Sequence, residues 1–306
     1  MSIRSLPMSR AWTWFLQAVN LGMRNPRAVF GAALLMVATL YLLVMAGGLL
    51  GSLMGGGGAT PSTATLALML MTVVAVFMLV PVLVGGLMHV IHESESGRPV
   101  QPRDLFAPFR QGRASKLAAF GSLQIMAMLL GGLVTTQLAG SDYMTAYSEA
   151  VNAILQQKTP APLPAPAHPG LLFLWQIAFN YFTTTVVLLG IALVALSGTN
   201  FGQAISGGAR AALRNFAPNL LAAVLFFAAV MIAGLMLSIV GSVVLLVLGK
   251  IFMPLALIVG LLLTFAFITA VLVVVCGGGY LIWRDTFADA SAGDATKPTA
   301  PSHIEA

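Results

Sequence analysis

LALMLMTVVAVFMLVPVLVGGLMHVI, residues 66–91, contains no Asp, Glu, Lys or Arg and is long enough to cross a membrane as one helix. A transmembrane helix needs about 20 predominantly apolar residues to span the hydrocarbon core. The whole chain has a similar composition, because 58% of its 306 residues are hydrophobic and only 8% are charged. Ordinary soluble domains contain roughly 45–50% apolar and about 25% charged residues. The sequence therefore predicts an all-α integral membrane protein.

Five further apolar stretches of similar length predict a six-helix membrane domain over residues 28–284. The predicted transmembrane helices cover about 28–53, 66–91, 117–139, 170–196, 219–245 and 254–283. An amphipathic cytoplasmic segment, 1–27, precedes this domain, and a disordered cytoplasmic tail, 285–306, rich in Ala, Ser, Asp and Pro, is expected after it. Between the third and fourth transmembrane helices, residues 141–157 predict a surface helix.

The distribution of basic residues predicts the orientation of the chain in the membrane. Of the fifteen Lys and Arg residues, all but Lys158 and Lys250 fall on the side that carries both termini when six helices are drawn. By the positive-inside rule this side is the cytoplasm, so both termini of a multi-pass protein are expected there. The net charge of +6 is then interpreted as orientation and contact with anionic lipid, with no nucleic acid as a partner. The basic residues predicted to face lipid on this side are Arg24, Arg27, Arg103, Arg110, Arg113, Arg210 and Arg214.

A weak internal repeat runs through the chain. AVNLGMRNPRAVFGAALL (18–35) can be laid over GARAALRNFAPNLLAAVL (208–225), with an Arg-Asn pair before a transmembrane helix in each. RDLFAPFRQGRASK (103–116) occupies the equivalent place before the third transmembrane helix. The pattern favours a threefold repeat, in which each unit is an amphipathic interfacial helix followed by a membrane hairpin. Chance similarity between apolar, low-complexity sequences is the alternative.

His89 and His92, with Glu93 beside them, are weak candidates for a metal site. Their order, HxxHE, matches neither HExxH nor HxxEH, and a catalytic zinc needs three protein ligands. Histidines at a helix end in the headgroup region are the alternative interpretation. The six predicted transmembrane helices contain no Asp, Glu, Lys or Arg away from their ends, so side chains for acid–base catalysis or ion coupling are not expected there. We therefore expect neither an enzyme nor a cofactor.

Gln124, Gln176 and Asn180 are uncharged polar residues inside predicted transmembrane helices. Such side chains need hydrogen-bond partners in lipid, and each bond contributes on the order of 1 kcal/mol. Hydrogen bonds between helices are one interpretation of this cluster. A polar cavity along a transport path is the other.

Three stretches together resemble a known family: WFLQAVNLGMRNP (14–26), PVLVGGLMHVIHESESGRPVQPRDLFAPFR (81–110) and YLIWRDTF (280–287). They are similar to an uncharacterised family of six-helix inner-membrane proteins found chiefly in proteobacteria. The likeness to YciC-like proteins and to the membrane domain that precedes some glycerophosphodiester phosphodiesterases is more distant. The resemblance implies a bacterial inner-membrane protein, and it implies no activity and no functional residues. The proline-rich stretch TPAPLPAPAHPG (159–170) departs from the shorter connection expected for the family.

The sequence thus favours a non-enzymatic inner-membrane protein that acts as an envelope scaffold or as a partner of other inner-membrane proteins. Its basic cytoplasmic side would rest on anionic membrane lipids. A transporter or channel for a neutral or lipidic substrate is the alternative function, with the three polar residues lining its path.

Overall fold

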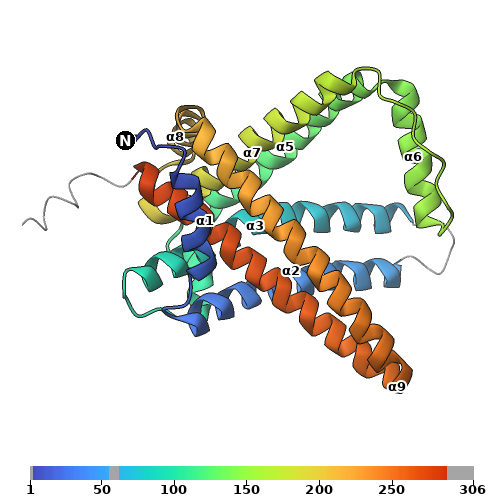
Figure 1. Cartoon of the computed structure of the whole chain (residues 1–306), viewed down its shortest axis with the longest axis horizontal. Coiled ribbons are helices and arrows are strands. Elements are labelled where there is room, and N and C mark those ends of the chain that lie inside the picture. Colours follow the sequence, from blue (N-terminus) through green and yellow to red (C-terminus); the bar gives the residue numbers. More distant parts are fainter. Residues whose placement is uncertain (1–2, 55–61, 288–306) are drawn as a thin grey trace, which may run out of the picture.

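The computed structural model describes residues 3–54 and 62–287, and every regular element within them is helical (Figure 1). The elements are α1 (Arg10–Asn20), α2 (Pro26–Met54), α3 (Thr63–Glu95), the 3-10 helix η1 (Pro102–Phe106), α4 (Ala107–Arg110), α5 (Ala114–Ala139), α6 (Ser141–Leu155), α7 (Pro169–Ser197), α8 (Phe201–Arg214) and α9 (Phe216–Phe287). Five of them, α2, α3, α5, α7 and α9, are long and apolar enough to cross a membrane. The fold is therefore that of an all-helical, multi-pass membrane protein, as the composition predicts.

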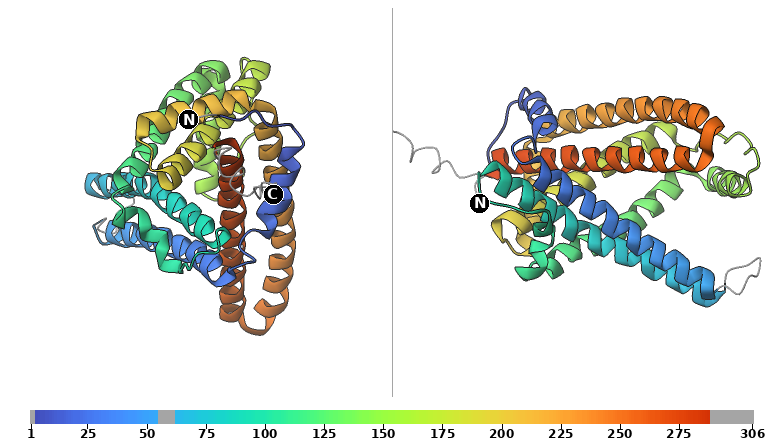
Figure 2. Two further views of the ribbon diagram at one scale, coloured as in Figure 1. Left: turned by 90° about the vertical axis from the view of Figure 1, so that its left-hand side faces the viewer. Right: turned by 90° about the horizontal axis from the view of Figure 1, so that it is seen from below.

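α9 consists of two helical arms separated by a sharp break, and the label covers all 72 residues of both arms. Phe252 has an extended backbone, with φ −158° and ψ 97°, and Pro254 follows it. Proline lacks the backbone N–H that would continue a helix. The chain reverses at this point, so that the two arms, 216–251 and 253–287, run antiparallel (Figures 1 and 2). They correspond to the fifth and sixth predicted transmembrane helices, which the sequence analysis treats as separate.

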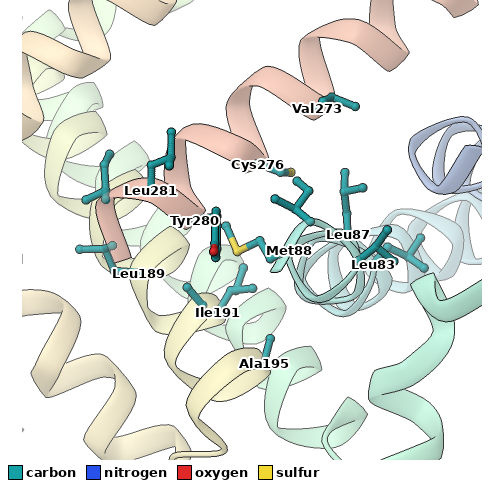
Figure 3. Close-up of a cluster of buried hydrophobic side chains, with 14 of the residues drawn as sticks. Leu83, Leu87, Met88, Leu189, Ile191, Ala195, Val273, Cys276, Tyr280 and Leu281 are labelled. Carbon is teal, nitrogen blue, oxygen red and sulfur yellow. The ribbon is translucent and has the colours of Figure 1, made fainter. Parts of the chain in front are cut away.

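Three helical hairpins, α2 with α3, α5 with α7 and the two arms of α9, diverge from one end of the molecule (Figure 2). We call this end the shared end, because α1, η1, α4 and α8 also lie there. The core is concentrated in the same place, where buried side chains of α3, α7 and the second arm of α9 meet (Figure 3). Leu83, Leu189 and Cys276, one from each hairpin, are all at most 2% exposed. The three hairpins are thus held together at their shared end.

Two glycines on the first and second hairpins permit the close approach of backbones at this end. A Cβ on Gly86 of α3 would lie 1.8 Å from the backbone oxygen of Leu105 in η1. A Cβ on Gly121 of α5 would lie 2.2 Å from the backbone oxygen of Phe77 in α3. Only a residue without a side chain fits at either contact, so η1 and α5 can lie directly against α3.

The short elements before the hairpins pack in a closed cyclic order. α1 precedes the first hairpin and packs on α9, whereas η1 and α4 precede the second hairpin and pack on the first. α8 precedes the third hairpin and packs mainly on α7 of the second. Each short element therefore covers the hairpin that comes before it in this cycle, and α1 closes the cycle by covering the last one.

Away from the shared end, the hairpins expose apolar side chains. Leu42, Leu70 and Leu235 are between 64% and 66% exposed, and many neighbours on the same helices are similar. Such surfaces are stable in hydrocarbon, where exposed apolar groups face lipid instead of water. α6 and the proline-rich segment connect α5 to α7 at the opposite end, as the predicted surface helix requires.

The ends of some predicted segments differ from the structure. α9 continues to Phe287, so Asp285 and the two residues after it are helical, although the sequence analysis assigns them to the tail. The remainder of that tail and most of the glycine-rich turn between the first two transmembrane helices lie outside the described residues.

Candidate functional site

Asp285, near the end of α9, anchors α1 at the shared end. Its carboxylate accepts hydrogen bonds from the Arg10 Nε and the Trp14 indole nitrogen, both at 2.8 Å. The Asp285 side chain is only 9% exposed, and Trp14 is fully buried. A third donor, Nε of the adjacent Arg284, lies 3.0 Å from the other carboxylate oxygen. The carboxylate is therefore surrounded by donors that compensate for its removal from water.

Asn215 fixes the N-terminal segment to the same end. Its amide oxygen accepts from the backbone N–H of Leu6 at 2.9 Å, and its amide nitrogen donates to the backbone oxygen of Arg4 at 2.9 Å. The backbone N–H of Arg4 in turn donates to the Thr286 carbonyl at 3.1 Å. Asn215 is 1% exposed, so this Asn of the proposed repeat is a buried structural clamp.

Two carboxylates at the end of α3, those of Glu93 and Glu95, are each paired with an arginine. Arg98 makes two contacts with Glu93, the second of them at 2.7 Å. Arg24 lies 3.9 Å from the carboxylate of Glu95 and donates to the Glu95 backbone oxygen at 2.9 Å. These contacts are exposed to solvent, where a single ion pair contributes little to stability. Each of these two carboxylates is neutralised by its arginine, so the pairs add no net negative charge to this surface.

Asp104 stabilises the start of η1. Its carboxylate accepts from the backbone N–H of Gln101 at 2.9 Å and from Arg110 at 2.6 Å. These two interactions, the backbone bond first, hold the pKa of Asp104 below its usual value. The N–H group that it binds lies three residues before it in the sequence.

The seven predicted basic residues fall into two groups. Arg24 and Arg110 are paired with carboxylates, as described, and Arg113 donates to the backbone oxygen of Ala195. The other four are exposed, and none of them makes an ion pair or side-chain hydrogen bond with a described residue. These four residues are Arg27, Arg103, Arg210 and Arg214. We call them the free arginines.

Arg27 stands at the head of an apolar groove. The groove has a volume of about 700 Å³ and lies between the start of α2 and the second arm of α9. Phe30 and Leu34 line it from α2, and Leu262 and Phe265 line it from α9. The groove has a guanidinium group at one end and an apolar surface below it. This arrangement complements the phosphate group and acyl chain of an anionic phospholipid.

A second, smaller cavity lies between α7 and both arms of α9. Its volume is about 200 Å³, and each of the three helices contributes four lining residues. Most of the lining is apolar, with Asn219 as the buried polar exception. Both polar atoms of its side-chain amide lack a hydrogen-bond partner among the described residues. An unpaired buried amide is unusual, because buried polar groups are nearly always hydrogen-bonded.

The histidine cluster is assembled only in part. Nδ1 of His89 lies 3.9 Å from Oε1 of Glu93. The Glu93 carboxylate also forms a salt bridge with Arg98. His92 turns toward aromatic residues of α9, and its Nδ1 is 3.5 Å from the Tyr280 hydroxyl. Among residues 3–54 and 62–287, no group of three His, Cys, Asp or Glu side chains is arranged to hold a metal ion. The contacts are those of packing at a helix end.

The predicted polar cluster is divided in the structure. Gln176 donates to the Thr135 hydroxyl on α5 at 3.2 Å, and Asn180 donates to the Gln176 backbone oxygen at 2.7 Å. Gln124 lies eleven positions before Thr135 on α5, or about 16 Å at 1.5 Å per residue, and makes no side-chain hydrogen bond with a described residue. None of the three predicted residues lines either cavity described above.

The main residue of the α1 anchor, Asp285, and that of the smaller cavity, Asn219, are not predicted from the sequence. The sequence places Asp285 in the tail and Asn219 at the boundary of a transmembrane helix. The signal for Asn219 is present in the sequence, because it is an amide followed by a long apolar stretch. Nothing in the local sequence of Asp285 identifies Arg10 and Trp14 as its partners, since they lie more than 270 positions away.

Comparisons of the chain with protein-family models, with curated proteins and with solved structures found no match. The resemblance to the six-helix proteobacterial family therefore stays a prediction, and the functional argument rests on the geometry of this chain.

Proposed function

We propose that the protein is a non-enzymatic, six-span protein of a bacterial inner membrane, and that it binds anionic phospholipid through its shared end. In this role it serves as an envelope scaffold or as a partner for other inner-membrane proteins. The observation that carries the proposal is the position of Arg27 above the apolar groove between α2 and α9. The other free arginines support it, because carboxylates of this chain neutralise neighbouring cations and leave these four exposed.

A phospholipid suits the groove for two reasons. Its phosphate would pair with the Arg27 guanidinium, which contributes about 1 kcal/mol for a cation near an anionic membrane surface. One acyl chain would cover the apolar side chains of α2 and α9 that line the groove. Arg27 also lies in the first turn of α2, where the positive end of the helix dipole favours an anion nearby.

Six crossings and cytoplasmic termini are part of this proposal. The two arms of α9 would each cross the bilayer, which together with α2, α3, α5 and α7 makes an even number. A reporter enzyme that is active only in the cytoplasm, fused after Phe287, is expected to be active. A second fusion in the turn near Lys250 should be inactive. The opposite pattern, or activity in both fusions, would refute this topology.

The cyclic packing at the shared end supports the threefold repeat. Each proposed unit supplies a short helical element and a hairpin, and each short element covers the hairpin of the preceding unit. Chance similarity of sequence does not lead one to expect such regular contacts. The repeat would place the free arginines of all three units around a single membrane surface.

The lipid-binding test compares arginine variants in purified, delipidated protein. Phosphatidylglycerol is expected to raise the melting temperature of the wild type more than phosphatidylcholine does, and Arg27→Gln should remove a measurable part of that difference. Replacing all four free arginines with Gln should remove most of it. Lys250→Gln, which removes a cation at the opposite end, is the matched control and should behave as wild type. Equal responses of Arg27→Gln and Lys250→Gln would contradict the proposal.

Transport of a neutral or lipidic substrate is the second candidate, and the cavity between α7 and α9 favours it. Its test is translocation of a fluorescent neutral lipid between leaflets of proteoliposomes. Binding of anionic lipid without any translocation supports the scaffold, whereas protein-dependent translocation supports the transporter.

A further inference from the structure

The cavity between α7 and α9 is lined by the buried side-chain amide of Asn219. Asn219 lies one turn into the first arm of α9 and is 4% exposed. Neither Oδ1 nor Nδ2 has a hydrogen-bond partner among the described residues. The amide therefore offers one acceptor, and at least one N–H that Tyr181 does not use, to whatever occupies the cavity.

The hydroxyl group beside this amide cannot satisfy its oxygen. Tyr181 neighbours Asn219 and already donates its hydroxyl proton to the Ala212 backbone oxygen at 2.8 Å. The Tyr181 oxygen can at most accept a proton from Nδ2 of Asn219. No described residue donates a hydrogen bond to Oδ1 of Asn219, so a donor on a bound molecule would satisfy it.

The remaining lining determines the rest of the ligand. The other residues around the cavity are apolar, apart from Thr184 and Thr185, and no ionisable side chain lines it. A phosphate or ammonium group at this position would be an uncompensated charge in an apolar site. The volume of about 200 Å³ also exceeds the roughly 30 Å³ share of one water molecule. The cavity therefore suits an apolar body with an uncharged polar group.

The cavity is also accessible from the lipid. Ala223 on the first arm of α9 and Thr184 on α7 both line the cavity, and both are exposed, so the cavity is not closed off from its surroundings. A lipid can thus enter laterally between α7 and α9, and its tail can remain in the bilayer while its polar end reaches Asn219.

From these observations we propose that the cavity binds a neutral membrane lipid with a free hydroxyl group, of the diacylglycerol type. The lipid hydroxyl donates to Oδ1 of Asn219, and an ester carbonyl of the lipid accepts from Nδ2. Part of one acyl chain lies against Phe226 and the apolar lining. This site is separate from the groove at Arg27 and makes no use of an anionic headgroup, so either site can fail its test without affecting the other.

Photolabelling in lipid nanodiscs tests the site directly. The full chain is reconstituted in phosphatidylcholine with a trace of diacylglycerol that carries a diazirine in one acyl chain, and labelled peptides are identified by mass spectrometry. A phosphatidylcholine with the same diazirine chain is the comparison probe. The diacylglycerol probe is expected to label α7 and both arms of α9 at least five times more than the phosphatidylcholine probe.

Variants separate the amide from the space around it. Asn219→Leu should reduce diacylglycerol labelling about 25-fold, the effect of two neutral hydrogen bonds of about 1 kcal/mol each. Ala223→Phe leaves Asn219 in place and fills the mouth of the cavity, so labelling should fall at least tenfold. Asn180→Leu is the matched control, since Asn180 is an exposed asparagine bonded to its own helix, and its labelling should equal that of wild type.

A stability measurement keeps the inference testable if labelling is weak. In lipid-free detergent, Asn219→Leu should melt no lower than wild type, because it removes an amide that lacks a partner. Added diacylglycerol should then raise the melting temperature of wild type but not of Asn219→Leu. Equal labelling by both probes, equal labelling of Asn219→Leu and Asn180→Leu, or a much lower melting temperature for lipid-free Asn219→Leu would each overturn the proposal.

Discussion

Replacing Asp285 with Ala is expected to detach α1 from the end of α9. The substitution leaves the indole N–H of Trp14 without an acceptor, and Trp14 is 0% exposed. A hydrogen bond to a charged acceptor contributes about 1.5–3 kcal/mol, and an unpaired buried donor adds to the loss. The Arg10 side chain is 40% exposed, so its share is no more than about 1 kcal/mol. The expected destabilisation is about 3 kcal/mol, which at about 2.1 cal/mol/K per residue corresponds to a fall in melting temperature of roughly 5 °C for a chain of 306 residues.

Cys276 provides the assay for this prediction. It is the single cysteine of the chain and is 2% exposed, so a fluorogenic maleimide reports the temperature at which the shared end opens. Asp142→Ala, at an exposed carboxylate on α6, is the control and should leave the transition unchanged. In a Trp14→Phe background, Asp285→Ala should cost only about 1 kcal/mol, because the indole donor is already absent. A melting temperature equal to that of Asp142→Ala, or the same loss in both backgrounds, would refute the reasoning.

Two further predictions concern the packing of η1. Gly86→Ala should destabilise the protein by at least about 2 kcal/mol, because its Cβ would lie 1.8 Å from the Leu105 backbone oxygen. Gly132 has open space beside it, so Gly132→Ala should be neutral or slightly stabilising in the same maleimide assay. The backbone N–H of Gln101, and after it the Arg110 side chain, lower the pKa of Asp104 in the folded protein. The ionised Asp104 carboxylate therefore contributes its full stabilisation above the unfolded pKa, near 3.8. This stabilisation is lost as the pH falls through the lower folded pKa. Asp104→Asn should therefore reduce the change in melting temperature between pH 5 and strongly acidic pH, as followed by circular dichroism, and an unchanged acid response would contradict this assignment.

The positions of the long helices could be predicted because a bilayer imposes one simple requirement on each of them. A run of about 20 apolar residues marks a helix wherever it occurs. The same requirement says nothing about which helix faces are in contact. The close approach of η1 to α3 depends on the absence of a side chain at Gly86, and many other glycines of the chain have open space beside them.

The candidate sites were harder to predict, because polarity indicates the need for a partner but not the identity of that partner. Gln176, Asn180 and Asn219 look equivalent in the sequence. In the structure the first bonds to α5, the second bonds to its own helix, and the third has no partner among the described residues. This difference arises from how α7 and α9 approach each other, which the local sequence does not encode.

The packing of α1 on α9 has a consequence for biosynthesis. α1 is synthesised before its anchor, because Asp285 follows Arg10 by 275 positions. At typical synthesis rates of about 5–20 residues per second, α1 must wait roughly 14–55 s before its docking surface has been made. During this interval Trp14 and its neighbours are available to the membrane surface or to an insertion factor. Closure of the shared end therefore requires that the second arm of α9 has been synthesised, and a chain interrupted before that point would display α1 as an uncovered amphipathic helix.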